Sequence, residues 1–386
     1  MGDYSLRLRV LVIFAFTALI SYGCYGQDTT TSKVYSLSVA TGSILKNYPS
    51  FPERGLMALC TASMGWQTYG SSEWQHDFRY PVIGFSLTAG STGNQAVLGN
   101  LFAVMPFLSW TKGVDWRKEF KVGLGFAYYT KHFDAISNTG NTLIGSHLTN
   151  ITSVEFALSK RVSSSFALRM ALGFSHFSNG HTRLPNLGIN SPTFSLGVVL
   201  NEPLKDRFIA QPDTLLSNFR ILLEAGLGYH EYGESTEPVN GPLYHIYSLS
   251  AGVNYRFSRL HNFFVILTGS YYSSFRGFIE RTDLFSEDQM LNASTLVLYF
   301  GHEFMAGHIG IDTRIGAYLF NPFRKRYTRQ ILDQKYDGRL FNSNKLGVNY
   351  YLFNTKRGGG NLRLGLYIKA NMGQADFVEW QVGWLF

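Results

Sequence analysis

Apolar and polar residues alternate along several segments of this chain, most clearly along residues 377–386. One face of that segment carries only apolar or aromatic side chains: Val378, Trp380, Val382, Trp384 and Phe386. The same alternation recurs at 362–369 and 308–319, where charged residues lie on the second face. A period of two places successive side chains on opposite faces of a β-strand. Strands with one aliphatic face and one charged face are typical of a membrane β-barrel.

Composition leaves few alternatives to a closed barrel. The 386 residues are 45% hydrophobic and only 16% charged, yet no apolar stretch reaches the roughly 20 residues that a membrane-spanning helix needs. An open sheet would leave backbone groups unpaired in lipid. We therefore expect an all-β protein, a transmembrane antiparallel β-barrel of about 14 strands, with limits of about 12 and 16.

The first residues have the layout of a secretion signal. Arg7 and Arg9 precede an apolar run over residues 10–20, which is too short to cross a bilayer as a helix. We expect cleavage after Gly26. Lipid attachment at Cys24 is the alternative, although the residues before it fit that pattern poorly.

Export and the barrel pattern together predict a place in the bacterial outer membrane. We expect a signal peptide at 1–26 and one barrel over 27–386, of which 27–80 could in part be periplasmic. Short and long connections alternate along the chain, as they do in such barrels, except that 201–216 is long where a short turn is expected. The net charge of +8 fits anionic lipid headgroups, and no nucleic-acid module is recognisable.

One hairpin carries polar residues where its lipid-facing side should stay apolar. The apolar face of residues 166–174 continues, at a period of two, to His176 and Ser178, and the returning strand places Asn190 outward as well. Polar groups facing acyl chains cost free energy unless they are paired or used. A serine two residues from a histidine suits nucleophilic catalysis, and an amide can orient the imidazole. This pattern predicts acyl transfer on a membrane lipid.

These residues resemble the PagL-type lipid A 3-O-deacylases, an acyloxyacyl hydrolase-like family with the pattern His-x-Ser-Asn-small followed by Pro-Asn-x-Gly-Ile. The two halves read here His176-Phe-Ser178-Asn179-Gly180 and Pro185-Asn186-Leu-Gly188-Ile189. The resemblance implies a serine esterase with His176 as general base and Ser178 as nucleophile, and with Asn186 near the oxyanion site. The family's acidic third member falls on Asn190 in this chain.

From this resemblance we expect Asn190 to orient His176, and backbone N–H groups near Asn179, Gly180 and Asn186 to stabilise the oxyanion. Lipid A, or lipopolysaccharide, is the expected substrate, outer-membrane lipids surround the protein, and no cofactor or metal is expected. Glu155 and Glu224 are poor substitutes for the acid, because a period of two points both into the lumen.

Two alternatives stay open. Outer-membrane phospholipase A proteins share His-x-Ser-Asn-Gly with an Asn fourteen residues after the His, as in this chain. A phospholipase A is therefore the second enzymatic candidate, and calcium is conceivable only there. The alternative of another class is a non-enzymatic porin or lipid transporter, in which the motif would have no catalytic role.

Overall fold

The computed structural model describes residues 33–386, apart from 47, 50, 164–165, 201–217, 235, 332, 334–340 and 354–359. The expected signal peptide at 1–26 lies outside the described residues. Within them, no helix combines the length and the apolar character needed to cross a membrane.

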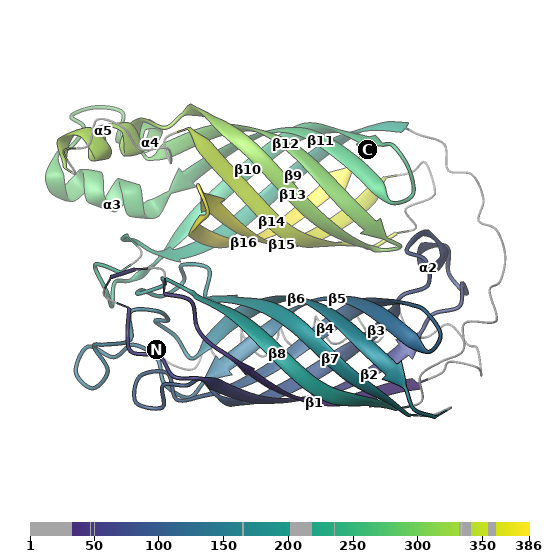
Figure 1. Ribbon diagram of the computed structural model, residues 1–386. Coiled ribbons are helices and arrows are strands. Elements are labelled where there is room, and N and C mark those ends of the chain that lie inside the picture. The colour runs from purple at the N-terminus through teal and green to yellow at the C-terminus, as the bar shows by residue number, and fades with distance from the viewer. Residues whose placement is uncertain are drawn as a thin grey trace.

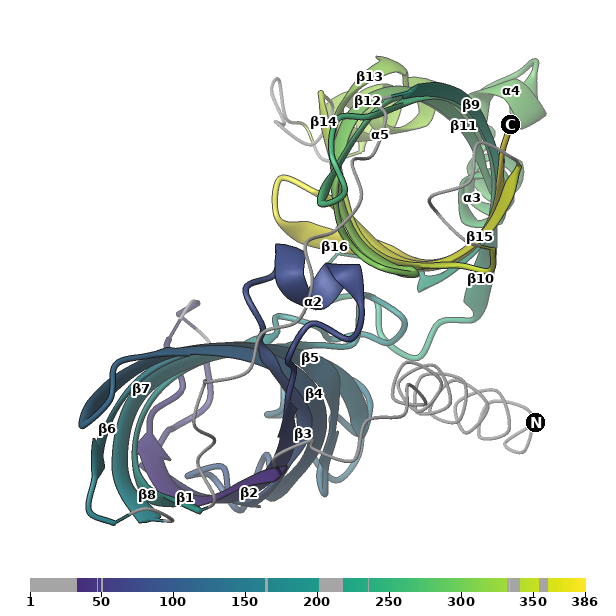
Figure 2. The ribbon, with the colours of Figure 1, turned by 90° about the vertical axis from the view of Figure 1, so that its right-hand side faces the viewer.

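The strands close into two antiparallel barrels of eight strands each (Figures 1 and 2). The first contains β1 (Lys33–Gly42), β2 (Met57–Gln67), β3 (Val82–Ser91), β4 (Asn100–Lys112), β5 (Trp116–Tyr129), β6 (Leu148–Arg161), β7 (Phe166–Ser178) and β8 (Ile189–Leu200). The second contains β9 (Asn218–Glu231), β10 (Leu243–Arg256), β11 (His261–Tyr272), β12 (Ser294–Ala306), β13 (Ile309–Phe320), β14 (Asn342–Tyr351), β15 (Asn361–Asn371) and β16 (Gln374–Leu385). β1 pairs with β8, and β9 pairs with β16, so both barrels are closed.

The expectation of an antiparallel barrel is confirmed, but a single barrel of about 14 strands was wrong. Periodicity identifies strands one at a time, whereas closure depends on pairing between strands far apart in the sequence. The long connection at 201–216, anomalous for one barrel, joins β8 to β9 and thus the two barrels; it lies outside the described residues. β1 and β2 occupy part of the 27–80 segment and belong to the first barrel wall.

Helices lie at both ends of the barrels. α3 (Ser273–Thr282), α4 (Gln289–Asn292) and α5 (Pro322–Gln330) lie at one end of the second barrel, in the connections after β11 and β13 (Figure 1). We call this the long-loop end. At the opposite end, α2 (Glu73–Asp77) of the first barrel meets the β10–β11 turn, where Arg259 lies 3.5 Å from Glu73 and 3.7 Å from Asp77.

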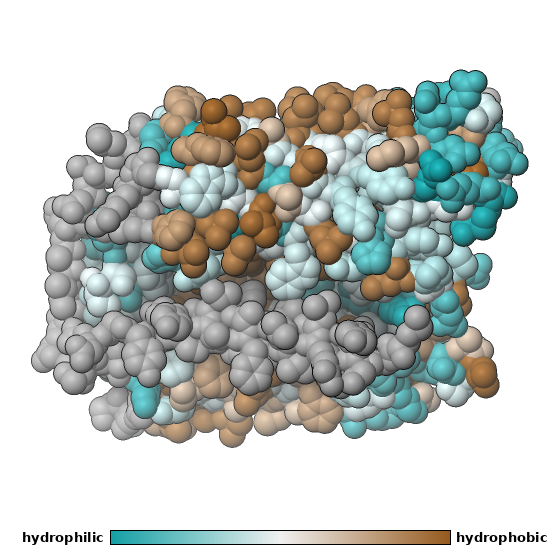
Figure 3. Space-filling model, turned by 180° about the vertical axis from the view of Figure 1, so that it is seen from behind, coloured by the Kyte–Doolittle hydropathy of each residue, from teal (hydrophilic) through white to brown (hydrophobic). Residues whose placement is uncertain are grey.

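The barrel exteriors are apolar and the interiors are charged. On β7 the outward side chains Leu168, Met170, Leu172 and Phe174 are all exposed, as the alternation predicts. Hydrophobic residues are concentrated along the strand walls in Figure 3, and hydrophilic residues gather at the end that carries α3 and α5. Apolar outer walls of this kind are typical of barrels that are surrounded by lipid.

Ion pairs fill the interior of the second barrel. Arg314 is fully buried and bonds to Glu224 at 2.8 Å and to Asp312 at 2.8 Å. Lys345 bonds to Glu379 at 2.5 Å in the same interior. Glu224 therefore points inward, as the period of two predicts.

Candidate active site

The pairing of β7 with β8 brings the motif residues together at the long-loop end. His176 lies directly opposite Asn190 in the register, and Ser178 is the last residue of β7. The His176 Nδ1–H donates to the Asn190 Oδ1 at 2.8 Å. In a neutral imidazole this bond places the proton on Nδ1 and leaves Nε2 as the acceptor nitrogen, the form that a general base requires.

Ser178 is buried at the point where β7 turns into the connection 179–188, here called the β7–β8 loop. Its Oγ accepts the Asn186 Nδ2–H at 3.1 Å and the Gly180 N–H at 3.1 Å. Among the hydrogen bonds of the described residues, none joins Ser178 to His176. The two residues are related by their spacing of two on β7, which places them on one face of the strand.

The predicted oxyanion donors already have acceptors within the loop. The Asn179 N–H donates to the Asn186 Oδ1 at 3.1 Å, and the Gly180 N–H donates to Ser178. The Asn179 side chain braces the same turn, accepting the His181 N–H at 3.0 Å and donating to the Arg183 carbonyl at 2.7 Å. Asn186 thus bonds both to the Ser178 hydroxyl and to the backbone that follows it.

Gly188 leaves room for the imidazole. Its φ of +72° lies in the left-handed region, and a Cβ built there would be 3.3 Å from the His176 Cε1. The loop is also fixed to its own barrel at this point, since the Gly188 N–H donates to the Leu143 carbonyl at 3.0 Å.

The motif residues occupy the exterior face of the strand, but they are less exposed than that face suggests. His176 and Asn190 are half-buried and Ser178 is buried, in contrast to the exposed Phe174 two residues before His176. The reason is that the loop folds back over the end of β7, with Asn186 on the serine hydroxyl. Periodicity gives the face of a strand residue but not what a following loop lays over it.

A serine–histidine contact that the sequence did not predict lies in the second barrel. The Ser274 Oγ and the His230 Nε2 are 2.8 Å apart, and both side chains are buried. The His230 Nδ1–H donates to the Asp376 backbone carbonyl at 3.2 Å, while the Asp376 carboxylate bonds to Lys369 and Arg324. Ser274 is fully buried, and the Asp376 carboxylate, whose Oδ1 lies 3.9 Å from the His230 Nδ1, is bonded to two cations, so we interpret this contact as structural.

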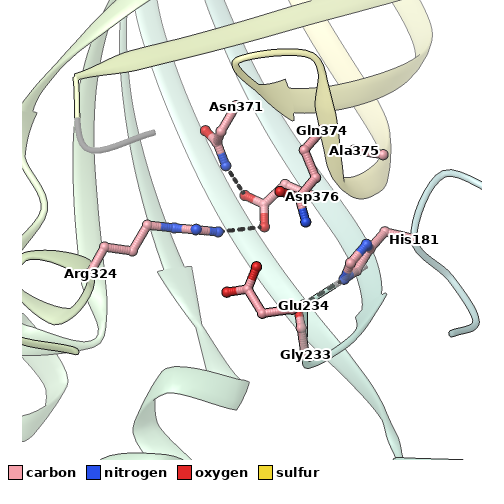
Figure 4. A pocket seen from close by; sticks show the side chains of 8 residues that line it. All are labelled: His181, Gly233, Glu234, Arg324, Asn371, Gln374, Ala375 and Asp376. Atoms are coloured by element: carbon pink, nitrogen blue, oxygen red, sulfur yellow. Dashed lines mark hydrogen bonds and ion pairs between the residues drawn. The ribbon is translucent and has the colours of Figure 1, made fainter. Parts of the chain in front are cut away.

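The β7–β8 loop also reaches the second barrel. The buried His181 donates from Nε2 to the Gly233 carbonyl at 3.2 Å, and it lines a small polar pocket with Arg324, Asp376 and their neighbours (Figure 4). Burial lowers the pKa of His181, and the nearby Asp376 partly opposes that effect. The sequence did not predict these contacts, because they join residues of different barrels.

Comparisons with known proteins agree with this division of the chain. The family model described as lipid A 3-O-deacylase (PagL) matches residues 61–199, within the first barrel. The model described as acyloxyacyl hydrolase, C-terminal domain, matches residues 218–386, the second barrel. No match was found among curated protein sequences.

Similar solved structures include small barrels. The outer membrane enzyme PagL is 16% identical, covers 44% of this chain and 99% of its own, and has a TM-score of 0.32. Neisserial surface protein A is 9% identical, with coverages of 44% and 97% and a TM-score of 0.32. CdiB from Acinetobacter baumannii is 10% identical, with coverages of 92% and 60% and a TM-score of 0.19. The family matches, and not these structures, carry the comparison: residues 61–199 resemble the lipid A 3-O-deacylase (PagL) family, and residues 218–386 resemble the C-terminal domain of acyloxyacyl hydrolases.

Proposed function

We propose that this protein is a serine esterase of the bacterial outer membrane that removes an ester-linked acyl chain from lipid A, at the 3-position. The observation that carries the proposal is the 2.8 Å bond between His176 and Asn190, on the strand face that ends in Ser178. The family match supports a deacylase, and the apolar barrel walls support a substrate that lies in the membrane.

In the first half of the reaction, the Ser178 Oγ attacks the ester carbonyl carbon. His176 Nε2 takes the hydroxyl proton, and Asn190 keeps the ring in the orientation that presents Nε2. The tetrahedral intermediate then collapses, the bond to the sugar oxygen breaks, and His176 returns the proton to that oxygen. The products of this half are the shortened lipid and an acyl ester on Ser178.

In the second half, water hydrolyses the acyl ester. His176 takes a proton from the water as it attacks the acyl carbon, the bond from that carbon to the Ser178 Oγ then breaks, and His176 returns the proton to the Oγ as the fatty acid leaves. The sequence of steps uses only the protein, the lipid and water, so the proposal includes no cofactor. In the family's usual pattern an acid orients the imidazole; an amide oxygen can fill this role, as in cysteine proteases with a Cys-His-Asn arrangement.

We assign oxyanion stabilisation to backbone N–H groups beside the serine. The Gly180 N–H points at the Ser178 Oγ from 3.1 Å, so it lies near any oxyanion formed on a carbonyl bonded to that oxygen. The Asn179 N–H and the region of Asn186 are the other candidates. Removing one such donor typically lowers the rate by ~10²-fold or more.

A phospholipase A is the second candidate function. Asn190 favours it, because the outer-membrane phospholipase pattern has an asparagine at that spacing from the histidine. Phospholipids and lipid A both present acyl esters at the membrane surface, so the same residues would carry out the same chemistry. The difference lies in the substrate, which an activity assay separates.

The test is mass spectrometry of lipid A and of glycerophospholipids incubated with the refolded protein. We expect the wild type to remove one ester-linked acyl chain from lipid A, and Ser178→Ala to lower this rate by at least about 10³-fold. Ser274→Ala is the matched control, because it removes another buried serine, which bonds to His230 in the second barrel, and it should keep wild-type activity. Lysophospholipid as the product would favour the phospholipase, and no product from folded protein would refute both.

A further inference from the structure

The β7–β8 loop contacts both barrels. Its second half bonds to the first barrel, and its first half bonds to the second barrel. On the side of the first barrel, the Gly188 and Leu187 N–H groups donate to carbonyls of the β5–β6 connection at 3.0 and 3.4 Å. On the side of the second barrel, the contacts involve residues 180–184 and the end of β9. The half that faces the second barrel includes Leu184, two residues before the Asn186 that bonds to Ser178.

Glu231, the last residue of β9, makes the central contact. Its side chain is fully buried, and its Oε2 accepts the Leu184 N–H at 2.9 Å. Its Oε1 accepts the Gly241 N–H, and Arg183 lies 3.8 Å away from the same carboxylate. In addition, the Glu231 N–H donates to the His181 carbonyl at 3.1 Å. One residue of the second barrel therefore bonds to the loop through both its backbone and its side chain.

Close packing accompanies these hydrogen bonds. A Cβ built at Gly180 would collide with Val378 of β16, and one built at Gly233 would come within 2.6 Å of the Leu184 Cδ1. The loop therefore approaches the second barrel as closely as glycine allows. A loop held this way has little freedom to move relative to Ser178.

A buried carboxylate is costly unless hydrogen bonds satisfy it, and here it receives N–H donors from two separate segments. Without the carboxylate, the Leu184 and Gly241 N–H groups would lose their acceptor. The backbone around Leu184 would then shift, and Asn186 would carry that shift to the serine hydroxyl. Among the described hydrogen bonds, none joins the Glu231 carboxylate to His176 or Ser178. Its effect on these residues therefore passes through the backbone of the β7–β8 loop.

We propose that Glu231 is a positioning residue for the reaction at Ser178, and that the second barrel is a built-in scaffold that holds the catalytic loop of the first. This inference rests on the proposed function for its activity readout. In this inference the second barrel contributes to catalysis by holding the β7–β8 loop, and it supplies no catalytic residue.

The first test compares the steady-state kinetics of lipid A deacylation. We expect Glu231→Ala to lower kcat by ~10²-fold, the order of effect that follows a displacement of about 1 Å, with a smaller change in KM. Glu231→Gln keeps the shape but replaces one acceptor oxygen with an NH₂ group, and we expect kcat to fall by roughly tenfold. Glu237→Gln is the matched control: Glu237 is exposed in the same β9–β10 connection and should leave kcat unchanged.

The second test does not depend on activity. Hydrogen–deuterium exchange of the full chain in lipid nanodiscs should show faster exchange in residues 179–188 of Glu231→Gln, with unchanged exchange in β7 and β8. Wild-type kcat together with wild-type loop exchange in the folded Gln variant would overturn the inference, even if the Ala variant did not fold. If wild type deacylates no lipid yet the exchange difference is present, the proposed function fails and the loop contact stands.

Discussion

Asn190 stands where the family's pattern has an acidic residue, and it reaches the same ring nitrogen that an acid would. Its Oδ1 accepts the His176 Nδ1–H at 2.8 Å, so the tautomer is fixed without a negative charge. An amide orients the ring but stabilises the imidazolium less than a carboxylate does. Residue 190 can therefore affect the reaction in two ways, through the orientation of the ring and through its own charge.

Replacing this amide separates the two effects. Asn190→Ala removes the acceptor, and we expect kcat to fall by ~10²-fold, because the ring loses its orientation. Asn190→Asp keeps the acceptor and adds charge, so activity should persist while the acidic limb of the pH–rate profile moves to higher pH, since a neighbouring carboxylate favours the protonated imidazole. Values of kcat measured from pH 5 to 9 for both variants test these expectations. An Ala variant as active as wild type would mean that Asn190 has no role in the reaction.

Sequence reasoning found the residues that are local to one hairpin. His176, Ser178, Asn186 and Asn190 lie within fifteen positions of one another, and the structure brings them together as predicted, apart from a His176–Ser178 bond. Glu231 was missed, because its partner Leu184 is 47 positions away and neither residue belongs to a local pattern. The catalytic roles themselves stay predictions until the variants are assayed.

At the scale of elements, strands were predictable and loops were not. A period of two revealed the apolar faces of β7, β13, β15 and β16, and the apolar residues on these outward faces are exposed or half-buried, as expected for a barrel wall. The β7–β8 loop has no periodicity, and its conformation depends on side chains of the second barrel. We expect its buried His181 to make this docked conformation sensitive to pH.

The sign of that sensitivity follows from the pKa of His181, which burial lowers from the ordinary value of 6.5. The unfolded chain then binds the proton more readily than the folded protein, so stability is present above about pH 6.5 and is lost as the pH falls. Asp376 and Glu234 face the ring and favour the proton, whereas Arg324 opposes it. The lowered pKa means that burial prevails over these charges.

We expect the free energy of unfolding in detergent to decrease below about pH 6.5, by at most about 1.4 kcal/mol per pH unit for one histidine. His181→Gln keeps an N–H donor for the Gly233 carbonyl and should weaken this dependence. His76→Gln, on α2 at the opposite end, is the control and should retain it. Identical pH profiles for wild type and His181→Gln would contradict the assignment.

For the whole molecule, the number of barrels was the main error of sequence reasoning. Sixteen strands of one barrel and sixteen strands of two barrels have the same alternation, and only the pairing of β1 with β8 and of β9 with β16 distinguishes them. The difference matters for function, because eight strands enclose an interior just wide enough for side chains to fill. A single barrel of about 14 strands would have allowed a wider lumen.

The side chains that fill the second barrel argue against a passive pore. Arg314, Lys345 and Glu379 are almost completely buried, and each has an oppositely charged partner in the interior. In the first barrel, Arg169 bonds to Glu155 at 2.5 Å and to Glu119 at 2.9 Å. Interiors occupied by paired charges leave little continuous space for water or solutes.

We therefore expect no steady single-channel conductance when the purified protein is inserted into a planar lipid bilayer. A large porin prepared in the same detergent is the control for insertion and should give stepwise conductance. The Ser178→Ala variant should likewise give no conductance, since Ser178 takes no part in the ion pairs of either interior. Regular, voltage-independent steps from wild type and from Ser178→Ala would mean that the ion pairs of the interior do not seal it, and would make the porin the better account of both barrels.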